Sequence, residues 1–228
     1  MNDDLLDFNF WPSFADLMLS LVLVLVLILF LIAAVLAVGV DIEPIRQKQG
    51  QLVTALARAY NVEPDTVGRA IIVSLYGKQT RDILIYNDLD KQLLKFSDHV
   101  LFPADVALLS EKGRVLLFIV GNTIKNQLSS LKEIQIQGHA DTDRSSRFPS
   151  NLELAAARAI EVFKFFQDSI AIDPASCLMS ATSFGEFKPS ERIAEDSTFD
   201  RSRLVESNMS DLLKAMNRRI EILLFYRH

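Results

Sequence analysis

The chain has 228 residues, half of them apolar, with a formal net charge of −5 and an isoelectric point near 5.3. Nucleic-acid binding requires basic clusters that displace counterions, so this charge argues against a nucleic-acid partner. The lone Cys177 excludes an intrachain disulfide and argues against a cysteine-based metal site. His99, His139 and His228 are too scattered in the sequence to indicate a metal cluster, and no cofactor is expected.

An uninterrupted apolar segment follows an acidic N-terminal tail. Residues 17–40 carry no charge, and at about 1.5 Å per residue they span roughly 36 Å, against a hydrocarbon core of about 30 Å. Residues 1–16 contain four aspartates and neither lysine nor arginine, unlike the basic first region of a signal peptide. The sequence therefore predicts a cytoplasmic tail over 1–16 and a retained transmembrane helix over 17–40.

A helical connector is expected over residues 41–81. Apolar residues recur at helical spacing over 41–60, which predicts an amphipathic helix that continues from the membrane span or begins just after it. Because an exposed stripe of Ile45, Leu52 and Leu56 would be a liability, we expect it to pair with its copy in a homodimer. The alternative is that the stripe packs on its own domain. After a turn, residues 67–75 are predicted to form a short helix.

The region 82–228 reads as one folded domain. Strand-like segments are expected at 83–86, 91–96, 133–137, 178–182 and 219–225, with helices at 107–126 and 151–167. This order predicts an α+β fold, a β-α-β-α-β domain with helices on one face of a mixed sheet. Residues 191–216 exceed what a minimal version of such a fold needs, and we interpret them as a surface insertion without an assigned role.

Four separated motifs between about residues 90 and 225 resemble the C-terminal domain of the OmpA family. They are Gly138-His139-Ala140-Asp141, the segment 151–159, Ser183-Phe184-Gly185-Glu186 with Pro189, and Asn217-Arg218-Arg219-Ile220-Glu221. The resemblance implies peptidoglycan binding, with Asp141 and Arg158 gripping the diamino acid of the stem peptide and Asn151 and Leu154 lining the same pocket. The chemistry fits, because a carboxylate suits an ammonium group and a guanidinium fork suits a carboxylate. The spacing of seven between Asn151 and Arg158 places both on one side of a helix.

Two positions depart from the pattern of that family. The usual Thr before the Asp is Ala140, and the usual Ser after the Leu is Ala155. Each change removes a hydroxyl, so we expect weaker affinity or an altered stem-peptide preference. From the residues alone, Arg158 could instead pair with an acidic neighbour on a solvated helix face, and Asp141 could cap a turn. To the segment 217–219 we assign the structural role of holding the last strand against the helices.

A second motif immediately precedes the apolar segment. Residues 10–18, Phe-Trp-Pro-Ser-Phe-Ala-Asp-Leu-Met, resemble the N-terminal signature of MotB-like B subunits of ion-driven motor stators, and look closest to the B subunit (ZorB) of the Zorya anti-phage defence system. The resemblance implies that Asp16 is the ion-carrying carboxylate. Ser13 and Ser20 lie on the same helical face and could help to ligate the transported H⁺ or Na⁺. A carboxylate costs about 2.5 to 3.5 kcal/mol at mid-membrane, so Asp16 would need a partner subunit.

The stator resemblance implies a homodimer inside a ring of larger MotA-like (ZorA-like) membrane subunits, with ion flow coupled to rotation. It implies no catalytic residues and no enzymatic activity. A flagellar-type stator B subunit and a passive peptidoglycan tether remain as alternatives. Ser13-x-x-Asp16 also fits a capping box, in which Asp16 only satisfies the amides at a helix end.

The resemblance also implies a topology, with a single pass through the inner membrane, a cytoplasmic N-terminus and a periplasmic C-terminal domain. The distribution of charge opposes it. The tail before the span is acidic, whereas Arg46, Lys48 and Arg58 follow it, so the positive-inside rule predicts the reverse orientation. Because peptidoglycan is absent from the cytoplasm, we give the family resemblance precedence over the charge rule.

Overall fold

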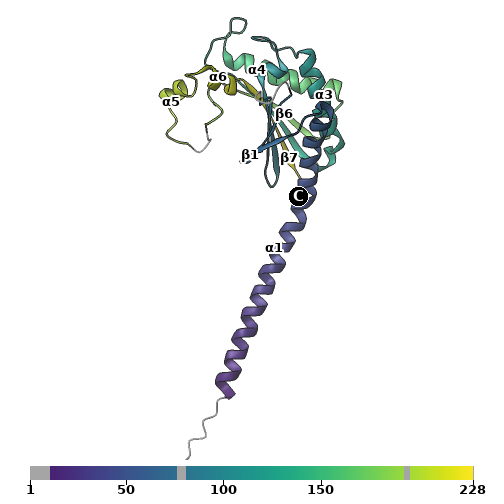
Figure 1. Cartoon of the computed structure of the whole chain (residues 1–228), viewed down its shortest axis with the longest axis vertical. Helices are drawn as coiled ribbons and strands as arrows, with labels where there is room; N and C mark the ends of the chain where they lie inside the picture. Colours follow the sequence, from purple (N-terminus) through teal and green to yellow (C-terminus); the bar gives the residue numbers. More distant parts are fainter. Residues whose placement is uncertain (1–10, 76–80, 193–195, 228) are drawn as a thin grey trace, which may run out of the picture. The chain divides into compact units, whose positions relative to one another are not determined.

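A computed structural model describes residues 11–75, 81–192 and 196–227, and the side chains of these residues except for 37–42 (Figure 1). The first element is the helix α1 (Trp11–Tyr60). Its segment Trp11–Leu36 is long and apolar enough to cross a membrane, and none of it is buried in the chain. The chain divides into two compact units, residues 1–44 and residues 45–228, and the second unit contains the sheet.

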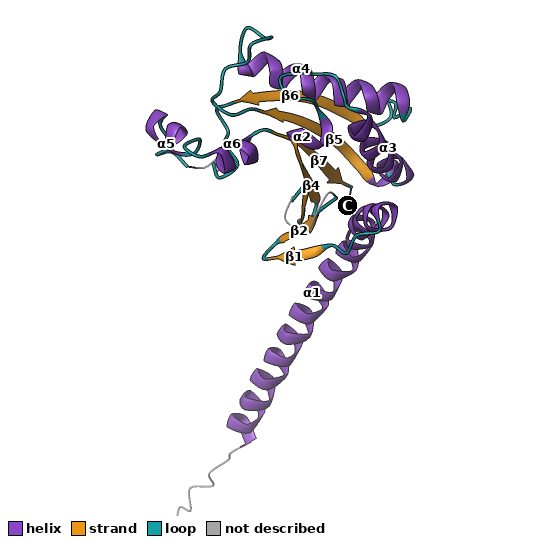
Figure 2. Ribbon diagram, turned by 45° about the horizontal axis from the view of Figure 1, so that its top comes forward, coloured by secondary structure: helices purple, strands orange, loops and turns teal. Residues whose placement is uncertain are grey.

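The second unit is built on a seven-stranded mixed sheet of order β1-β2-β3-β4-β7-β5-β6 (Figure 2). The strands are β1 (Asp65–Val67), β2 (Ala70–Val73), β3 (Ile83–Asn87), β4 (Lys91–Ser97), β5 (Leu131–His139), β6 (Leu178–Gly185) and β7 (Arg219–Tyr226). Only β5 and β6 pair in parallel, and every other neighbouring pair is antiparallel. The last strand, β7, lies between β4 and β5, so its alternate apolar side chains enter the middle of the core.

Helices α3 and α4 cover one face of this sheet (Figure 2). The helical elements of the unit are α2 (Asp98–Leu101), α3 (Glu111–Asn126), η1 (Leu128–Ser130), α4 (Asn151–Lys164), η2 (Phe165–Ser169), α5 (Arg201–Glu206) and α6 (Asp211–Asn217). The Ser110 hydroxyl accepts the Gly113 N–H and the Ser150 hydroxyl accepts the Glu153 N–H, so a serine caps the start of both long helices. The predicted α+β fold, with helices on one face of a mixed sheet, is confirmed.

The C-terminal part of α1 belongs to the core of the second unit. Ile45, Leu52 and Leu56 are 4%, 0% and 0% exposed and join the same hydrophobic cluster as the inward side chains of β3, β4 and α3. Between them, the Gln49 side chain donates a 2.9 Å hydrogen bond to the Asp88 carbonyl in the β3–β4 turn. The expected pairing of this stripe with a second copy is therefore wrong, because its apolar surface is already buried within its own chain.

The segment 67–75, predicted as a short helix, instead contains the end of β1, a turn and the strand β2, which form a hairpin over 65–73. β1 and β2 meet at a tight turn in which Gly68 has φ +61°, a left-handed conformation that glycine adopts at little cost. The run Ile71-Ile72-Val73 is β-branched, which favours a strand, and β2 pairs with β3 on the side away from the edge strand β1. The helical part of the predicted 41–81 connector thus ends at Tyr60. The predicted insertion at 191–216 contains α5 and most of α6.

Candidate functional site

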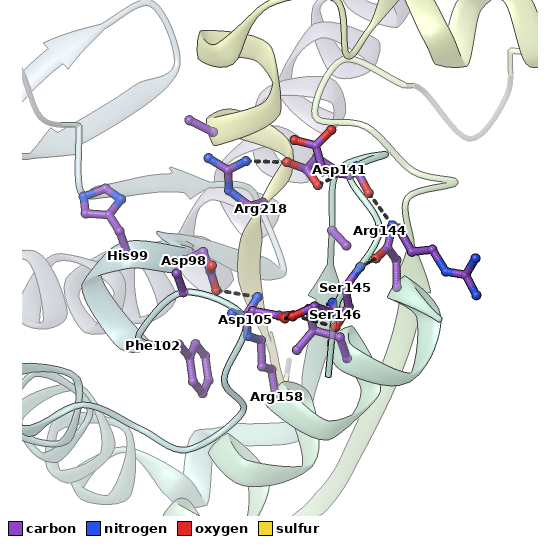
Figure 3. A pocket seen from close by; sticks show the side chains of 16 residues that line it. Asp98, His99, Phe102, Asp105, Asp141, Arg144, Ser145, Ser146, Arg158 and Arg218 are labelled. Atoms are coloured by element: carbon purple, nitrogen blue, oxygen red, sulfur yellow. Dashed lines mark hydrogen bonds and ion pairs between the residues drawn. The ribbon is translucent and has the colours of Figure 1, made fainter. Parts of the chain in front are cut away.

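The four residues predicted to bind peptidoglycan all line one pocket of about 420 Å³ (Figure 3). Asp141 follows the end of β5, whereas Asn151, Leu154 and Arg158 lie on α4. Other walls come from α2, from the loop between β5 and α4, and from the end of α6. Because α4 connects the parallel strands β5 and β6, its N-terminal turns and the end of β5 lie at the same end of the sheet.

Asn151 shapes the loop that carries Asp141. Its side-chain amide donates to the Asp141 carbonyl at 3.0 Å, and its side-chain oxygen accepts the Ser145 N–H at 3.0 Å. Both polar groups of this buried side chain are therefore used within the chain. Asn151 positions the loop, while Leu154 supplies an apolar wall.

Arg158 is 3% exposed and forms a buried ion pair with Asp98, with 2.9 Å between its Nη1 and the carboxylate Oδ1. Its Nε donates to the Val106 carbonyl at 2.9 Å and its Nη2 to the Pro103 carbonyl at 3.4 Å. The guanidinium also lies 5.2 Å from the centre of the Phe102 ring. Burial raises the pKa of the Asp98 carboxyl to about 6, although the Arg158 charge opposes this shift.

Asp141 is 3% exposed and is paired with Arg218, the residue between α6 and β7 (Figure 3). Its other oxygen, Oδ1, accepts the Asp143 N–H at 3.0 Å, so the carboxylate also closes a local turn. The sequence left two alternatives, that Asp141 caps a turn and that Arg158 pairs with an acidic residue, and the structure contains both interactions. That partner, however, lies in a buried position on α2 rather than on a solvated face of α4.

The rim of the pocket carries further polar groups. The Asp105 carboxylate accepts the hydroxyls of Ser145 and Ser146 at 2.5 and 2.6 Å, and these bonds hold the pKa of Asp105 at about 2. His99 is largely exposed on α2, and its Nε2 lies 3.3 Å from a carboxylate oxygen of the buried Asp82. The rim therefore presents a permanent negative charge and an imidazole next to the buried ion pairs.

The two departures from the family pattern differ in their consequences. Ala140 lines the pocket, so the missing hydroxyl changes its wall. Ala155 is 1% exposed and faces β5, where its carbonyl lies 2.0 Å from the position that a Cβ on Gly138 would occupy. It does not line the pocket, so a hydroxyl at this position would lie between α4 and β5 and would not contact a ligand.

Sequence reasoning missed the partners of the two charged residues. Asp98 and Arg218 lie far from Arg158 and Asp141 in the chain, and no periodicity links them. The structural role predicted for the segment 217–219 fits Asn217 and Arg219, whereas Arg218 pairs with Asp141 in the pocket. Asn217 bonds to the Ser190 N–H at 2.8 Å, and Arg219 pairs with Glu221 at 2.7 Å, both in buried positions.

The three candidate ion-site residues lie on α1. Ser13 lies inside α1, after the helical residues Trp11 and Pro12, so it does not act as the N-cap that a capping box with Asp16 requires. The Ser20 hydroxyl donates to the Asp16 carbonyl at 2.9 Å, and both residues are exposed. Within residues 11–75, 81–192 and 196–227, no cluster of three or more His, Cys, Asp or Glu side chains could hold a metal ion.

Comparisons with known proteins identify the domain. Residues 101–203 match the OmpA family, which makes this part of the chain an OmpA-like domain. No curated protein matches the chain significantly.

Solved structures share this fold. A putative MotB-like protein from Desulfovibrio vulgaris is 21% identical with a TM-score of 0.57, and the match covers 83% of this chain and 96% of that one. The periplasmic domain of Helicobacter pylori MotB is 18% identical with a TM-score of 0.54, over 71% of this chain and 90% of that one. The cell wall anchor of the T6SS from Pseudomonas aeruginosa is 20% identical with a TM-score of 0.50, over 65% and 91%. At these identities the likeness establishes the fold alone.

Proposed function

We propose that the chain is a membrane-anchored, peptidoglycan-binding subunit of the stator B type. One observation carries the proposal: a single pocket of an OmpA-like domain gathers Asp141, Asn151, Leu154 and Arg158. The ligand is the diamino acid of a peptidoglycan stem peptide, which offers an ammonium group to Asp141 and a carboxylate to Arg158. The fold shared with MotB-like structures supports this assignment.

Ligand binding at this site exchanges ion pairs rather than adding them. Asp141 and Arg158 already have the partners Arg218 and Asp98, so each ligand charge must replace an internal one. Asp98 can give way by taking a proton, since its pKa lies at about 6. We therefore expect the ligand carboxylate to reach Arg158 more readily below pH 6 than above it.

The wall-binding part is tested with the Asp141→Asn variant, which keeps the shape of the side chain and removes its charge. A charge-assisted contact contributes about 1.5 to 3 kcal/mol, so binding to purified peptidoglycan sacculi should weaken roughly ten- to a hundredfold. Asp88→Asn, in the exposed β3–β4 turn, is the matched control. Equal binding by wild type, variant and control would refute the assignment of Asp141 as a peptidoglycan-binding residue.

The membrane part of the proposal assigns ion transport to Asp16. A carboxylate within an apolar, exposed helix needs a protein or water partner, which a ring of MotA-like (ZorA-like) subunits around a homodimer would provide. A proton or Na⁺ that crosses the membrane releases about 2.3 kcal/mol per 100 mV, enough to drive a conformational cycle. The residues around Asp16 favour a Zorya-type anti-phage system over a flagellar-type stator, and neighbouring genes for a helicase or nuclease would support that choice.

A passive peptidoglycan tether is the second candidate, favoured by the fold shared with a T6SS cell wall anchor. The Asp16→Asn variant separates the two, because its amide keeps the size of the side chain but cannot take up and release a proton. Lost biological activity with normal assembly supports ion transport, whereas full activity supports the tether. Asp88→Asn serves again as the control.

The proposed topology places the chain in the inner membrane, with residues 1–16 in the cytoplasm and the OmpA-like domain in the periplasm. It is tested with reporter fusions at the C-terminus that are active in only one compartment. Activity of a cytoplasmic reporter alone would overturn both the wall-binding and the motor proposals, because peptidoglycan lies outside the cytoplasm.

A further inference from the structure

The short helix α6 makes two charged contacts with the loop that carries Asp141. Lys214 in α6 pairs with Asp143, with 2.6 Å between Nζ and Oδ1, and Arg218 just after the helix pairs with Asp141. Lys214 and Arg218 are four residues apart, so they extend from the same side of the helix. The Asp143 N–H in turn bonds to Asp141, which joins the two contacts into one network.

No residue of α6 belongs to the hydrophobic core, although Leu213 is half-buried. The helix has seven residues, too few to be stable alone, and Asn217 at its end is its only buried residue. Leu212 is 71% exposed and Met216 is 38% exposed. The side chain of Asn217 bonds to the Ser207 carbonyl at 2.9 Å and anchors the C-terminal end. The ion pairs of Lys214 and Arg218 with the loop therefore add to the few contacts that hold the rest of α6.

We propose that α6 is a latch that blocks two carboxylates at the pocket, because it places the chain's own cations where a cationic ligand would bind. This inference rests on the proposed function and adds regulation of the same site. In the closed state Arg218 occupies Asp141 and Lys214 holds α6 against the loop. The ammonium group of a diamino acid replaces the Arg218 side chain at Asp141, while the Arg218 backbone stays bonded to Asp98. The part of α6 before the anchored Asn217 then moves away from the loop.

The latch lowers the apparent affinity, because only the open fraction of molecules binds ligand. Breaking the Lys214 contact should increase that fraction without removing a group that touches the ligand. An exposed ion pair contributes modestly, so the expected gain is roughly two- to fivefold in binding. The same loss of restraint should increase backbone opening within α6.

The test uses the full chain in detergent and purified sacculi that contain diaminopimelate. Lys214→Ala should bind two- to fivefold more tightly than wild type, and the swapped pair Lys214→Asp with Asp143→Lys should return towards wild type. Arg203→Ala is the matched control, because it breaks a 2.6 Å ion pair with Asp196 elsewhere in the insertion. Unchanged or weaker binding by Lys214→Ala would overturn the latch, and weaker binding would make Lys214 a ligand contact.

A ligand-free measurement separates this inference from the proposed function. Amide hydrogen exchange over residues 211–218 should be faster in Lys214→Ala than in wild type or Arg203→Ala. If no form of the chain binds sacculi, the wall-binding proposal fails, while the exchange rates still decide whether Lys214 restrains α6. Equal exchange in all three forms would overturn the latch irrespective of any ligand.

Discussion

Replacing Arg158 with alanine should destabilise the domain as well as impair its pocket. The substitution leaves the Asp98 carboxylate, 8% exposed, without the Arg158 cation. It also removes the N–H groups that donate hydrogen bonds to the Val106 and Pro103 carbonyls. Breaking a buried ion pair from one side costs about 3 to 5 kcal/mol. This exceeds the roughly 0.5 kcal/mol that substitution of an exposed side chain usually costs.

The assay is urea denaturation of residues 45–228, the unit that contains its own core. A fragment from residue 80 would be unsuitable, because it lacks Leu52 and Leu56. At pH 7, Arg158→Ala should lower the free energy of unfolding by about 3 to 5 kcal/mol. At pH 5 the loss should be smaller, because Asp98 has a raised pKa in the wild type and takes a proton more readily once the Arg158 charge is absent.

The double variant Asp98→Ala with Arg158→Ala provides the internal control. If the cost arises from an uncompensated carboxylate, the double variant should be more stable than Arg158→Ala alone at pH 7. An Arg158→Ala domain that unfolds within about 0.5 kcal/mol of wild type would refute the reasoning. A double variant as unstable as the single one would place the cost in the lost carbonyl contacts instead.

Three further outcomes are expected for the same domain. Burial lowers the pKa of His139 from 6.5 to about 4. The contribution of the neutral imidazole to stability is therefore complete above pH 6.5 and declines as the pH falls towards 4. A His139→Gln variant should show a flatter dependence of melting temperature on pH over this range. Leu52→Ala should lower the free energy of unfolding by about 2 to 5 kcal/mol in chemical denaturation. A loss as small as that of an exposed residue, about 0.5 kcal/mol, would show that α1 does not pack on the sheet. Gly138→Ala should cost about 1 to 3 kcal/mol, measured by thermal melting, because the new Cβ would lie 2.0 Å from the Ala155 carbonyl oxygen and force α4 away from β5.

The fold followed from local patterns in the sequence, with one exception. The strands β3 and β4 were recognisable as short strand-like segments, and α4 because its apolar residues recur at helical spacing. The prediction of a short helix over 67–75 was wrong because it rested only on the preceding turn, after which a strand can begin as well as a helix. The β-branched run in β2 and the turn at Gly68 were the signals that would have corrected it.

For the site, the residues that line the pocket were predictable from the sequence, but their burial and their partners were not. The family motifs identified Asp141, Asn151, Leu154 and Arg158, and all four line one pocket. The same motifs gave no indication that these side chains are buried and already paired. The contribution of α6 was also out of reach, because the insertion carries no motif that links it to the pocket.

The sequence by itself determined the apolar segment, the order of the strands and the two long helices from residue 83 onward, and the residue types of the pocket, because each depends on neighbours within a few positions. Only the tertiary structure decided what covers the stripe of Ile45, Leu52 and Leu56, and which charges meet. An apolar stripe shows that a helix must be covered but not by what. An ion pair between α2 and α4, or between α6 and the loop after β5, depends on where the sheet places elements distant in the chain, and no local pattern encodes that placement.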